Sequence, residues 1–244
     1  MRSFFTEPEN VNGETIVLTE DAMHIKKVLR MNPGDEVLVF DGTGKEYVAV
    51  LEEIESSSVK CRILSESFSD SEPKIKVTVF QGIPKSDKME QIIQKCVELG
   101  VHKIVPVKTS RCVAKVKDSE KIKRWNKISR EAVKQCGRGL IPEVTEPVDF
   151  KTAVENLKEM DIPVMPYEVM GHEGKRGLKE LLSEKSGALS IGIIIGPEGG
   201  FSDDEASYAI SEGVNAVGLG KRILRTETVS GAMLAVIMYE NNEF

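Results

Sequence analysis

From residue 74 onward the sequence alternates apolar, strand-sized runs with helix-forming segments. The runs are nearly continuous in apolar residues, which is typical of strands buried on both faces. The predicted strands are 76–83, 103–107, 162–165, 189–195 and 216–219. The predicted helices are 86–99, 119–136, 178–184, 203–212 and 227–239. This alternation predicts a parallel sheet covered by helices on both faces, and therefore an α/β fold.

The first seventy residues instead contain short β-branched runs at close spacing. Turn-forming sequences such as Asn12-Gly13 separate these runs. The predicted strands are 15–18, 36–40, 47–51 and 59–64. One short helix is expected around Asp21–Leu29, and the serine-rich, acidic stretch Ser65–Pro73 is expected to be a linker. Strands at this spacing favour a small barrel.

The composition excludes several classes of protein. Of 244 residues, 40% are hydrophobic and 30% charged, which is ordinary for a soluble protein with a real core. No apolar run approaches the ~20 residues that span a bilayer, so no membrane partner is expected. Acidic and polar residues follow Met1–Phe5 at once, unlike a signal peptide, and a cytoplasmic protein is expected.

The cysteines and histidines are scattered along the chain, with no C-x-x-C pair. No metal site is predicted, and the cysteines are expected to be reduced thiols that mostly pack in the interior. These residues are Cys61, Cys96, Cys112, Cys136, His24, His102 and His172.

The formal net charge of −6 hides an asymmetry. Residues 1–72 hold 7 Lys and Arg against 15 Asp and Glu, a balance of −8, whereas residues 103–138 hold 12 against 3, a balance of +9. An approaching polyanion responds to local charge rather than to the total. The one-sided excess favours contact with phosphate groups over a merely solvated helix face.

A glycine-punctuated loop, Gly196–Gly200, follows the apolar run that ends at Ile195. Ser202 and Glu205 predict a capping box at the start of the next helix. Ligands of open α/β sheets bind at the carboxyl ends of the strands, and glycine lets the backbone approach them closely. The loop therefore indicates a ligand site, with an ordinary strand-to-helix turn as the alternative.

A second loop, Gly218–Gly220, precedes the cationic segment Lys221–Arg225. It lacks the third glycine of a dinucleotide fingerprint, and Gly42–Lys45 lacks the spacing of a Walker A loop. NAD and ATP are therefore rejected as first candidates for the ligand.

The two loops together closely resemble the signature of the ribosomal RNA small subunit methyltransferase E family, a member of the SPOUT class. The segments that carry this resemblance are Ile195–Ser202 and Leu219–Thr228. Other segments resemble the same family, in the same order, along nearly the whole chain. They are His24–Arg30, Gly34-Asp35, Asp41-Gly42, Lys88–Glu90, Lys95–Val101, Arg124-Trp125, Glu131-Ala132 and Gln135–Arg138.

The resemblance implies a PUA-like, RNA-binding β-barrel over residues 1–70 and a SPOUT methyltransferase domain with a trefoil knot over residues 74–244. It also implies a homodimer in which each cofactor site is completed near the subunit interface. The implied reaction transfers a methyl group from S-adenosyl-L-methionine to N3 of one uridine in 16S rRNA of the small ribosomal subunit.

By the same resemblance, S-adenosyl-L-methionine is expected to lie against both loops and the end of an earlier strand. The residues expected at the cofactor are Pro166, Tyr167, Glu168, Gly196, Pro197, Glu198, Gly199, Gly200, Leu219, Gly220, Ile223, Leu224, Arg225 and Thr228. Of these, Leu219, Ile223 and Leu224 are expected to contact adenine. Core packing is the alternative role for Tyr167 and Glu168.

Uridine N3 carries a proton at neutral pH, so the reaction needs a base, or a cation that stabilises the uridine anion. Arg225 and Arg222 can supply the cation. Glu198 and Glu227 are candidates for the base, so the predicted catalytic residues are Arg225, Glu198 and Glu227. In the alternative view Glu227 only begins the last helix and Arg225 only pairs with it.

Six cations are predicted to contact RNA: Lys26, Arg30, Arg111, Arg124, Arg138 and Arg222. For Arg30, pairing with nearby acids is the alternative. Two rival functions also stay open: a non-catalytic RNA-binding or ribosome-assembly protein, and a SPOUT methyltransferase that acts on another RNA. The intact loops favour the enzyme over the first rival, and the full-length resemblance favours ribosomal RNA over the second.

Overall fold

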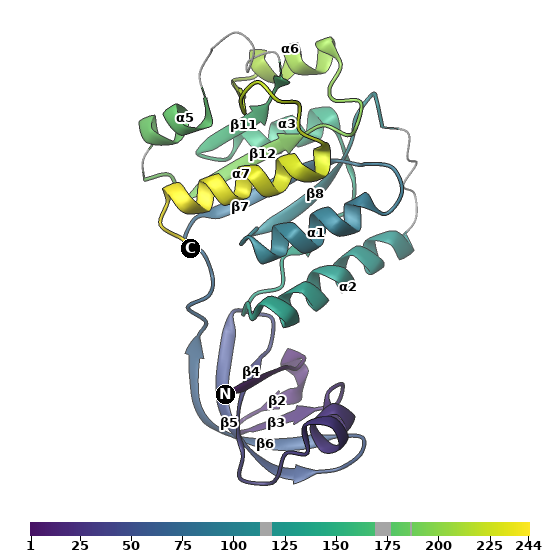
Figure 1. The fold of residues 1–244 in the computed structure, drawn as a ribbon, viewed down its shortest axis with the longest axis vertical. Helices are drawn as coiled ribbons and strands as arrows, with labels where there is room; N and C mark the ends of the chain where they lie inside the picture. Colours follow the sequence, from purple (N-terminus) through teal and green to yellow (C-terminus); the bar gives the residue numbers. More distant parts are fainter. Residues whose placement is uncertain (113–118, 169–176, 186) are drawn as a thin grey trace. The chain divides into compact units, whose positions relative to one another are not determined.

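The computed structural model describes residues 1–112, 119–168, 177–185 and 187–244 (Figure 1). They divide into two compact units. Unit 1 consists of Met1–Glu72 with Arg130–Ile141, and unit 2 of Pro73–Ser129 with Pro142–Phe244. The boundary falls inside helix α2 (Ser119–Cys136), so one helix contributes residues to both units.

Unit 2 is built on a parallel sheet with strand order β10-β8-β7-β12-β11-β13 and a short β9 paired with β8. Every pairing described in this sheet is parallel. The strands are β7 (Lys76–Gly82), β8 (Lys103–Lys108), β9 (Glu143–Val144), β10 (Val148–Asp149), β11 (Ile162–Pro166), β12 (Ser190–Ile195) and β13 (Asn215–Val217). The α/β fold and the five predicted strands of this part are confirmed.

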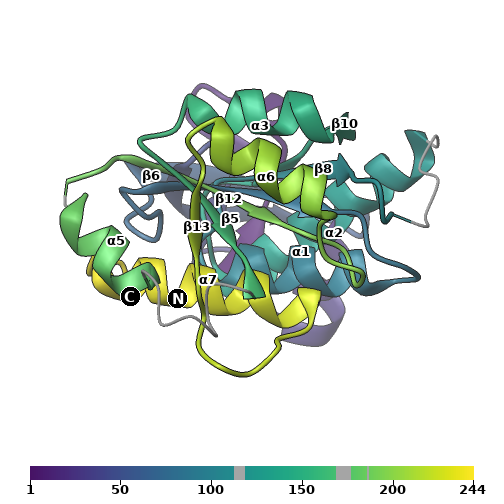
Figure 2. The same ribbon diagram turned by 90° about the horizontal axis from the view of Figure 1, so that it is seen from above.

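Helices cover both faces of this sheet. Figure 2 shows the sheet between α3 and α6 on one side and α1 and α7 on the other. Phe80 of β7 and Ile194 of β12 pack with Phe150 and Phe201 in a core on the α3 and α6 side. The helices of unit 2 are α1 (Lys88–Glu98), α3 (Phe150–Lys158), α5 (Leu178–Glu184), α6 (Asp203–Ser211) and α7 (Thr226–Glu240).

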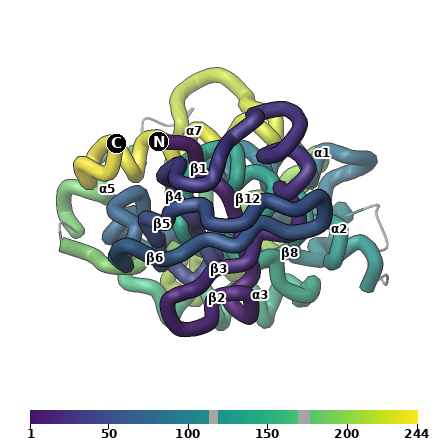
Figure 3. Tube along the Cα trace, turned by 90° about the horizontal axis from the view of Figure 1, so that it is seen from below, coloured from purple at the N-terminus to yellow at the C-terminus, as the bar shows by residue number. Residues whose placement is uncertain are grey.

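Unit 1 contains one six-stranded sheet with order β1-β4-β5-β6-β3-β2, and Figure 3 shows β4, β5 and β6 side by side. Its strands are β1 (Arg2–Phe5), β2 (Val11–Asn12), β3 (Thr15–Leu18), β4 (Glu36–Phe40), β5 (Lys45–Ile54) and β6 (Val59–Phe68). Two short helical segments, η1 (Pro8–Asn10) and η2 (His24–Leu29), accompany them. The helix expected around Asp21–Leu29 is thus confirmed as η2.

The predicted linker Ser65–Pro73 is wrong in its first half, because β6 continues through Phe68. The polar side chains in this last part of β6 form hydrogen bonds and ion pairs with side chains of β5. Glu66 lies 2.6 Å from the ammonium of Lys45, and Ser67 Oγ donates to a carboxylate oxygen of Glu46 at 3.2 Å. Polar cross-strand pairs of this kind let a strand form without apolar residues.

No helix in the described part of the chain is both long enough and apolar enough to cross a membrane. Cys61 and Cys96 are fully buried, and burial raises the pKa of each thiol to about 12. They therefore act as packing residues. Within the described ranges no three His, Cys, Asp or Glu side chains gather as metal ligands, and His172 lies outside those ranges.

A buried ion pair closes unit 1. Arg138 is 4% exposed, and its Nη2 and Nε atoms donate to the carboxylate of Glu72 at 2.6 and 3.2 Å. The same carboxylate accepts hydrogen bonds from the backbone amides of Gly139 and Leu140 at 3.1 and 3.0 Å. Glu72 thereby fixes the returning segment Arg130–Ile141 to the rest of the unit.

Replacing Glu72 with glutamine is expected to destabilise the protein by about 3 kcal/mol, because it leaves the buried guanidinium without a counter-charge. Urea denaturation followed by circular dichroism measures the effect. The matched control is Glu66→Gln, which removes a carboxylate from an exposed pair and should lower stability by less than about 1 kcal/mol. Equal losses for the two variants would contradict the assignment.

Candidate functional site

A pocket of about 510 Å³ opens in unit 2 where three segments meet. The segments are Pro166–Glu168 after β11, Ile195–Phe201 after β12, and Leu219–Thr226, which leads from β13 into α7. Lys88, Arg111, Asp203 and Val229 complete the wall. Carboxyl ends of parallel strands are the usual ligand edge of such sheets, and the volume lies within the ~300–1,000 Å³ of small-molecule sites.

Close backbone packing shapes the loop Gly196–Gly200. A Cβ atom on Gly196 would lie 2.9 Å from the carbonyl carbon of Gly200, so only glycine fits there. Gly200 itself has φ 65°, a left-handed conformation that side chains disfavour. The predicted capping box is confirmed, since Ser202 Oγ accepts from the amide of Glu205 and the Glu205 carboxylate accepts from the amide of Ser202.

A buried hydrogen-bonded chain joins this loop to the start of α7. Gln81 Nε2 donates to Thr226 Oγ1 at 2.9 Å, and Thr226 Oγ1 donates to the Gly196 carbonyl at 2.7 Å. Gln81 is fully buried and Thr226 is 6% exposed. Buried hydrogen bonds hold their partners firmly, because breaking one leaves a polar group unpaired. Two loops distant in sequence are thereby fixed against one another.

Glu198 points back toward the beginning of α1. Its carboxylate accepts from the backbone amide of Lys85 at 3.1 Å and lies 3.0 Å from the ammonium of Lys88. Burial alone raises the pKa of Glu198, but hydrogen bonds from its own backbone amide, from Lys88 and from Lys85 together lower that pKa below its ordinary value. Glu198 is thus held as a carboxylate, which makes it a weak proton acceptor.

Arg111 and its neighbour fasten the loop from the other side. Arg111 Nη1 donates to the Gly199 carbonyl at 2.8 Å. The backbone amide and hydroxyl of Ser110 donate to the two carboxylate oxygens of Glu205 at 2.7 and 2.9 Å. The end of the segment after β8 is therefore part of the wall of this pocket.

Most residues predicted for the cofactor line this pocket together: Pro166, Tyr167, Glu168, Gly196, Pro197, Glu198, Gly199, Gly200, Leu219, Gly220, Ile223, Leu224 and Arg225. Arg111 and Arg222, predicted to contact RNA, also line it. Thr228 and Glu227 do not, because α7 turns Thr226 and Val229 toward the pocket instead. Sequence reasoning missed Lys88, Ile195, Phe201, Asp203, Lys221, Thr226 and Val229.

Arg225 is the residue immediately before α7. Its carbonyl accepts from the amides of Thr228 and Val229, which begins the helix, while its exposed guanidinium has no ion pair or hydrogen bond within the described ranges. Arg225 does not form an ion pair with Glu227, the alternative role that the sequence left open. Glu227 instead lies 3.7 Å from the Lys88 ammonium. Arg225 is therefore free to meet a ligand.

The other cations predicted to contact RNA lie in different surroundings. Lys26 and Arg30 are exposed in unit 1. Arg124 is exposed as well, although it pairs with Glu90 at 2.8 Å. Arg138 is a correction, because its guanidinium is buried against Glu72 and is not available to a phosphate. Lys115 and Lys117 of the basic stretch lie outside the described residues.

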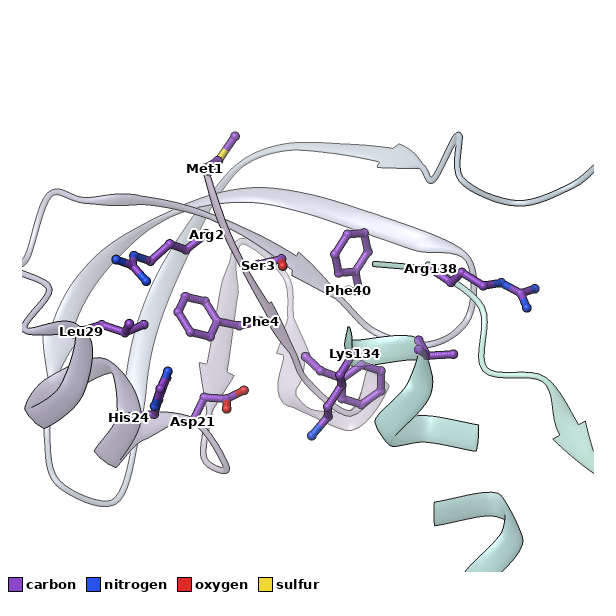
Figure 4. Close-up of a pocket in the computed structure, with 12 residues that line it drawn as sticks. Met1, Arg2, Ser3, Phe4, Asp21, His24, Leu29, Phe40, Lys134 and Arg138 are labelled. Atoms are coloured by element: carbon purple, nitrogen blue, oxygen red, sulfur yellow. The ribbon is translucent and has the colours of Figure 1, made fainter. Parts of the chain in front are cut away.

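Unit 1 has a second pocket, of about 400 Å³, beside strand β1. Figure 4 shows His24 and Asp21 near Phe4, with Phe40, Lys134 and Arg138 elsewhere around the strand. Lys134 is paired with Glu20 at 2.6 Å, and Arg138 with Glu72. Because internal partners neutralise these two cations, the pocket of unit 2 is the stronger candidate for the functional site.

Comparison with known proteins defines the class of this fold and site. Residues 71–238 match the RNA methyltransferase domain family, and residues 19–64 match the RNA methyltransferase PUA domain family. The chain is an RNA methyltransferase. It belongs to the ribosomal RNA small subunit methyltransferase E family, since it is 34% identical to the Bacillus subtilis protein of that name over 91% of this chain and 88% of the relative.

Other relatives support the assignment. The Synechocystis protein of the same name is 32% identical over 94% of this chain and 75% of its own length. The Neisseria gonorrhoeae enzyme, solved bound to S-adenosyl methionine, superposes with a TM-score of 0.82 and 34% identity over 98% of both chains. A Legionella pneumophila methyltransferase in complex with the same cofactor gives 0.82 and 32% identity over 98% and 97%.

Proposed function

We propose that this protein uses S-adenosyl-L-methionine to methylate N3 of one uridine in 16S rRNA of the small ribosomal subunit. The observation that carries the proposal is the meeting of three sequence-distant segments in a single pocket of unit 2. The segments after β11 and β12 and before α7 are those expected at the cofactor. The names of the relatives and the cofactor in two similar structures support the same activity.

The residues of the pocket fit this cofactor. Gly196 lets the loop pack tightly against its own backbone, and Gly200 has open space where a Cβ would stand, so a ligand can approach the main chain at Gly200 closely. Leu219, Ile223 and Leu224 supply apolar surface for a purine ring, and the side chain of Ile223 is open to a ligand because the residue is 76% exposed. When bound, S-adenosylmethionine supplies an electrophilic methyl group on a sulfonium.

The chain contributes alignment and charge to the reaction. Arg225 can place its unpaired guanidinium against O2 or O4 of the uridine and stabilise the anion that forms when N3 loses its proton. Glu198 orders the loop by bonding to Lys85 and Lys88 rather than by taking a proton. Solvent is then the simplest acceptor for the proton, with Arg225 lowering the cost of its release.

The finer features of the fold are part of the same proposal. The trefoil knot in residues 74–244 rests on the resemblance of the loops Ile195–Ser202 and Leu219–Thr228 to the family signature, and the side-by-side order β12-β11-β13 brings the segments that would form it together. Thr6 Oγ1, just after β1, donates to the Val17 carbonyl of β3 at 2.9 Å, which supports closure of residues 1–70 into an RNA-binding barrel. Tyr239 of α7 is 72% exposed and Val236 39%, which supports a homodimer. The compartment proposed is the cytoplasm.

Binding to 16S rRNA is expected to weaken steeply with salt, because Lys and Arg displace counterions from phosphates. Lys26→Gln and Arg30→Gln, at exposed cations for which no ion pair is formed within the described ranges, should each reduce the slope of log affinity against log salt by about 0.7–0.9. Fluorescence anisotropy with a labelled rRNA fragment measures this slope. Lys158→Gln is the control, since Lys158 pairs with Glu212 in an exposed position outside the candidate set. A slope that Lys26→Gln and Arg30→Gln leave unchanged would contradict the assignment.

Mass spectrometry of 16S rRNA tests the activity itself. Cells that lack their own N3-uridine methyltransferase for this rRNA are complemented with this chain, and N3-methyluridine is expected to reappear at a single position. Cells that carry the empty vector are the negative control, and Gly196→Ala should restore the modified nucleoside less completely than the unaltered chain. Absence of the modified nucleoside with the unaltered chain would overturn the proposed substrate.

A further inference from the structure

Three charged side chains from distant parts of the sequence meet at the wall of the unit 2 pocket. Lys88 of α1 lies 3.0 Å from Glu198 in the loop after β12 and 3.7 Å from Glu227 in the first turn of α7. Lys88 and Glu198 line the pocket, and Glu227 stands behind Lys88. We call Lys88, Glu198 and Glu227 the charged triad. Two carboxylates and one ammonium give it a net charge of −1.

The triad is better shielded from water than the other charges of the pocket. Side-chain exposure is 31% for Lys88, 28% for Glu198 and 15% for Glu227. The neighbouring cations Lys221, Arg222 and Arg225 are exposed. Solvent and salt screen exposed charges more strongly than half-buried ones. The charges of the triad are therefore screened less than the exposed cations of the pocket.

Within the described residues, the side chain of Glu227 forms no ion pair other than the one with Lys88. Its Oε2 atom is buried and has no hydrogen-bond partner among the described residues, and the nearest cation is the Lys88 ammonium. A buried carboxylate oxygen without a hydrogen bond carries a penalty that a protein normally avoids, and here the longer ion pair with Lys88 offsets part of it. The N-terminal end of the α7 dipole and the Lys88 ammonium both stabilise a negative charge on the Glu227 carboxylate. The retained negative charge points to an electrostatic role.

We propose that the charged triad makes the pocket discriminate between the methyl donor and its demethylated product by charge. This inference rests on the proposed function. S-adenosylmethionine carries a positive sulfonium, whereas S-adenosylhomocysteine has a neutral thioether at the same place. A local net charge of −1 favours the cationic ligand and, after methyl transfer, favours release of the neutral product. The triad thus contributes to specificity and turnover through its charge.

The test compares two affinities within each variant. Isothermal titration calorimetry on the full chain gives the dissociation constants of S-adenosylmethionine and S-adenosylhomocysteine, and their ratio cancels any general distortion of the pocket. Glu227→Gln removes a negative charge at nearly constant shape and should shift the ratio about fivefold toward the product. Lys88→Met makes the triad more negative and should shift it about fivefold toward the methyl donor.

Two further variants make the test decisive. Glu198→Gln should shift the ratio in the same direction as Glu227→Gln, and Lys88→Gln, which also removes the positive charge, replaces Lys88→Met if that variant does not fold. Glu212→Gln removes a carboxylate that pairs with Lys158 and does not line the pocket, so its ratio should equal that of the unaltered chain. Each shift should also shrink at high salt.

The outcomes separate the two proposals. If the unaltered chain binds both ligands but the ratio is the same in all variants, the triad inference is overturned while the proposed cofactor stands. If the unaltered chain binds neither ligand, the proposed function fails and the inference fails with it. Opposite shifts for Glu227→Gln and Lys88→Met support the charge mechanism.

Discussion

Replacing Arg225 with methionine is expected to lower kcat by about 10²–10³-fold, the usual loss on removing one group that stabilises a developing negative charge. The affinity for S-adenosylmethionine should change by less than about threefold, because the pocket wall keeps its backbone. The carbonyl of Arg225, not its side chain, begins α7, so the helix survives the substitution. Single-turnover methylation of small ribosomal subunits measures the effect.

The pH dependence distinguishes this role from a structural one. If Arg225 stabilises the uridine anion, higher pH should restore part of the rate of Arg225→Met, because solvent then removes the N3 proton more readily. Arg225→Lys should recover part of kcat, since it retains the positive charge. Arg222→Met, at a neighbouring exposed cation, should act mainly on RNA affinity. A loss for Arg225→Met that is the same at every pH would contradict the role.

Replacing Gly196 with alanine is expected to weaken cofactor binding by about 10–100-fold. The new Cβ would lie 2.9 Å from the carbonyl carbon and 3.0 Å from the Cα of Gly200, and backbone cannot yield as a side chain does. Overpacking of this kind costs about 1–3 kcal/mol, and each 1.4 kcal/mol is a factor of ten in affinity. Calorimetry with S-adenosylmethionine measures the change.

The controls come from the same loop and from α7. A Cβ on Gly199 would lie 3.3 Å from the Cβ of Arg111, which a shift of a few tenths of an ångström relieves, so Gly199→Ala should weaken binding less than Gly196→Ala. Gly231 in α7 would gain only an ordinary contact with Leu99 at 3.6 Å, and Gly231→Ala should leave binding unchanged. If Gly196→Ala and Gly199→Ala behaved alike, the close packing of Gly196 would not be what shapes the site.

The elements of unit 2 could be predicted because local patterns decide them. Buried parallel strands are read from apolar runs, and α2 and α5 begin and end at the expected residues. Helix α3 was missed, although Phe150, Ala153, Val154 and Leu157 follow the helical period and Asp149 caps it by accepting from the Thr152 amide. Short apolar runs rich in Val and Phe are ambiguous between helix and strand.

Most of the pocket wall could also be predicted, because glycine loops at the ends of strands are visible in the sequence. The side-chain interactions that hold this wall in place could not be predicted, because they join residues far apart in the sequence. Lys88 and Glu198 are 110 residues apart, and Gln81 and Thr226 are 145 apart. A count of charges also does not reveal which cations are already paired. In the sequence Arg138 is one more cation of a basic stretch, but in the fold its guanidinium forms an ion pair with Glu72.

The division of helix α2 between the units has a consequence for how this protein can be taken apart. The chain passes from one unit to the other at residues 72, 129 and 141, so unit 1 is not one contiguous stretch. A fragment that stops at Glu72 would lack Arg138, and would also lack Arg130 and Lys134, the partners of Glu20. A single uninterrupted stretch of the gene therefore cannot carry unit 1 by itself, with all of these ion pairs, into another protein.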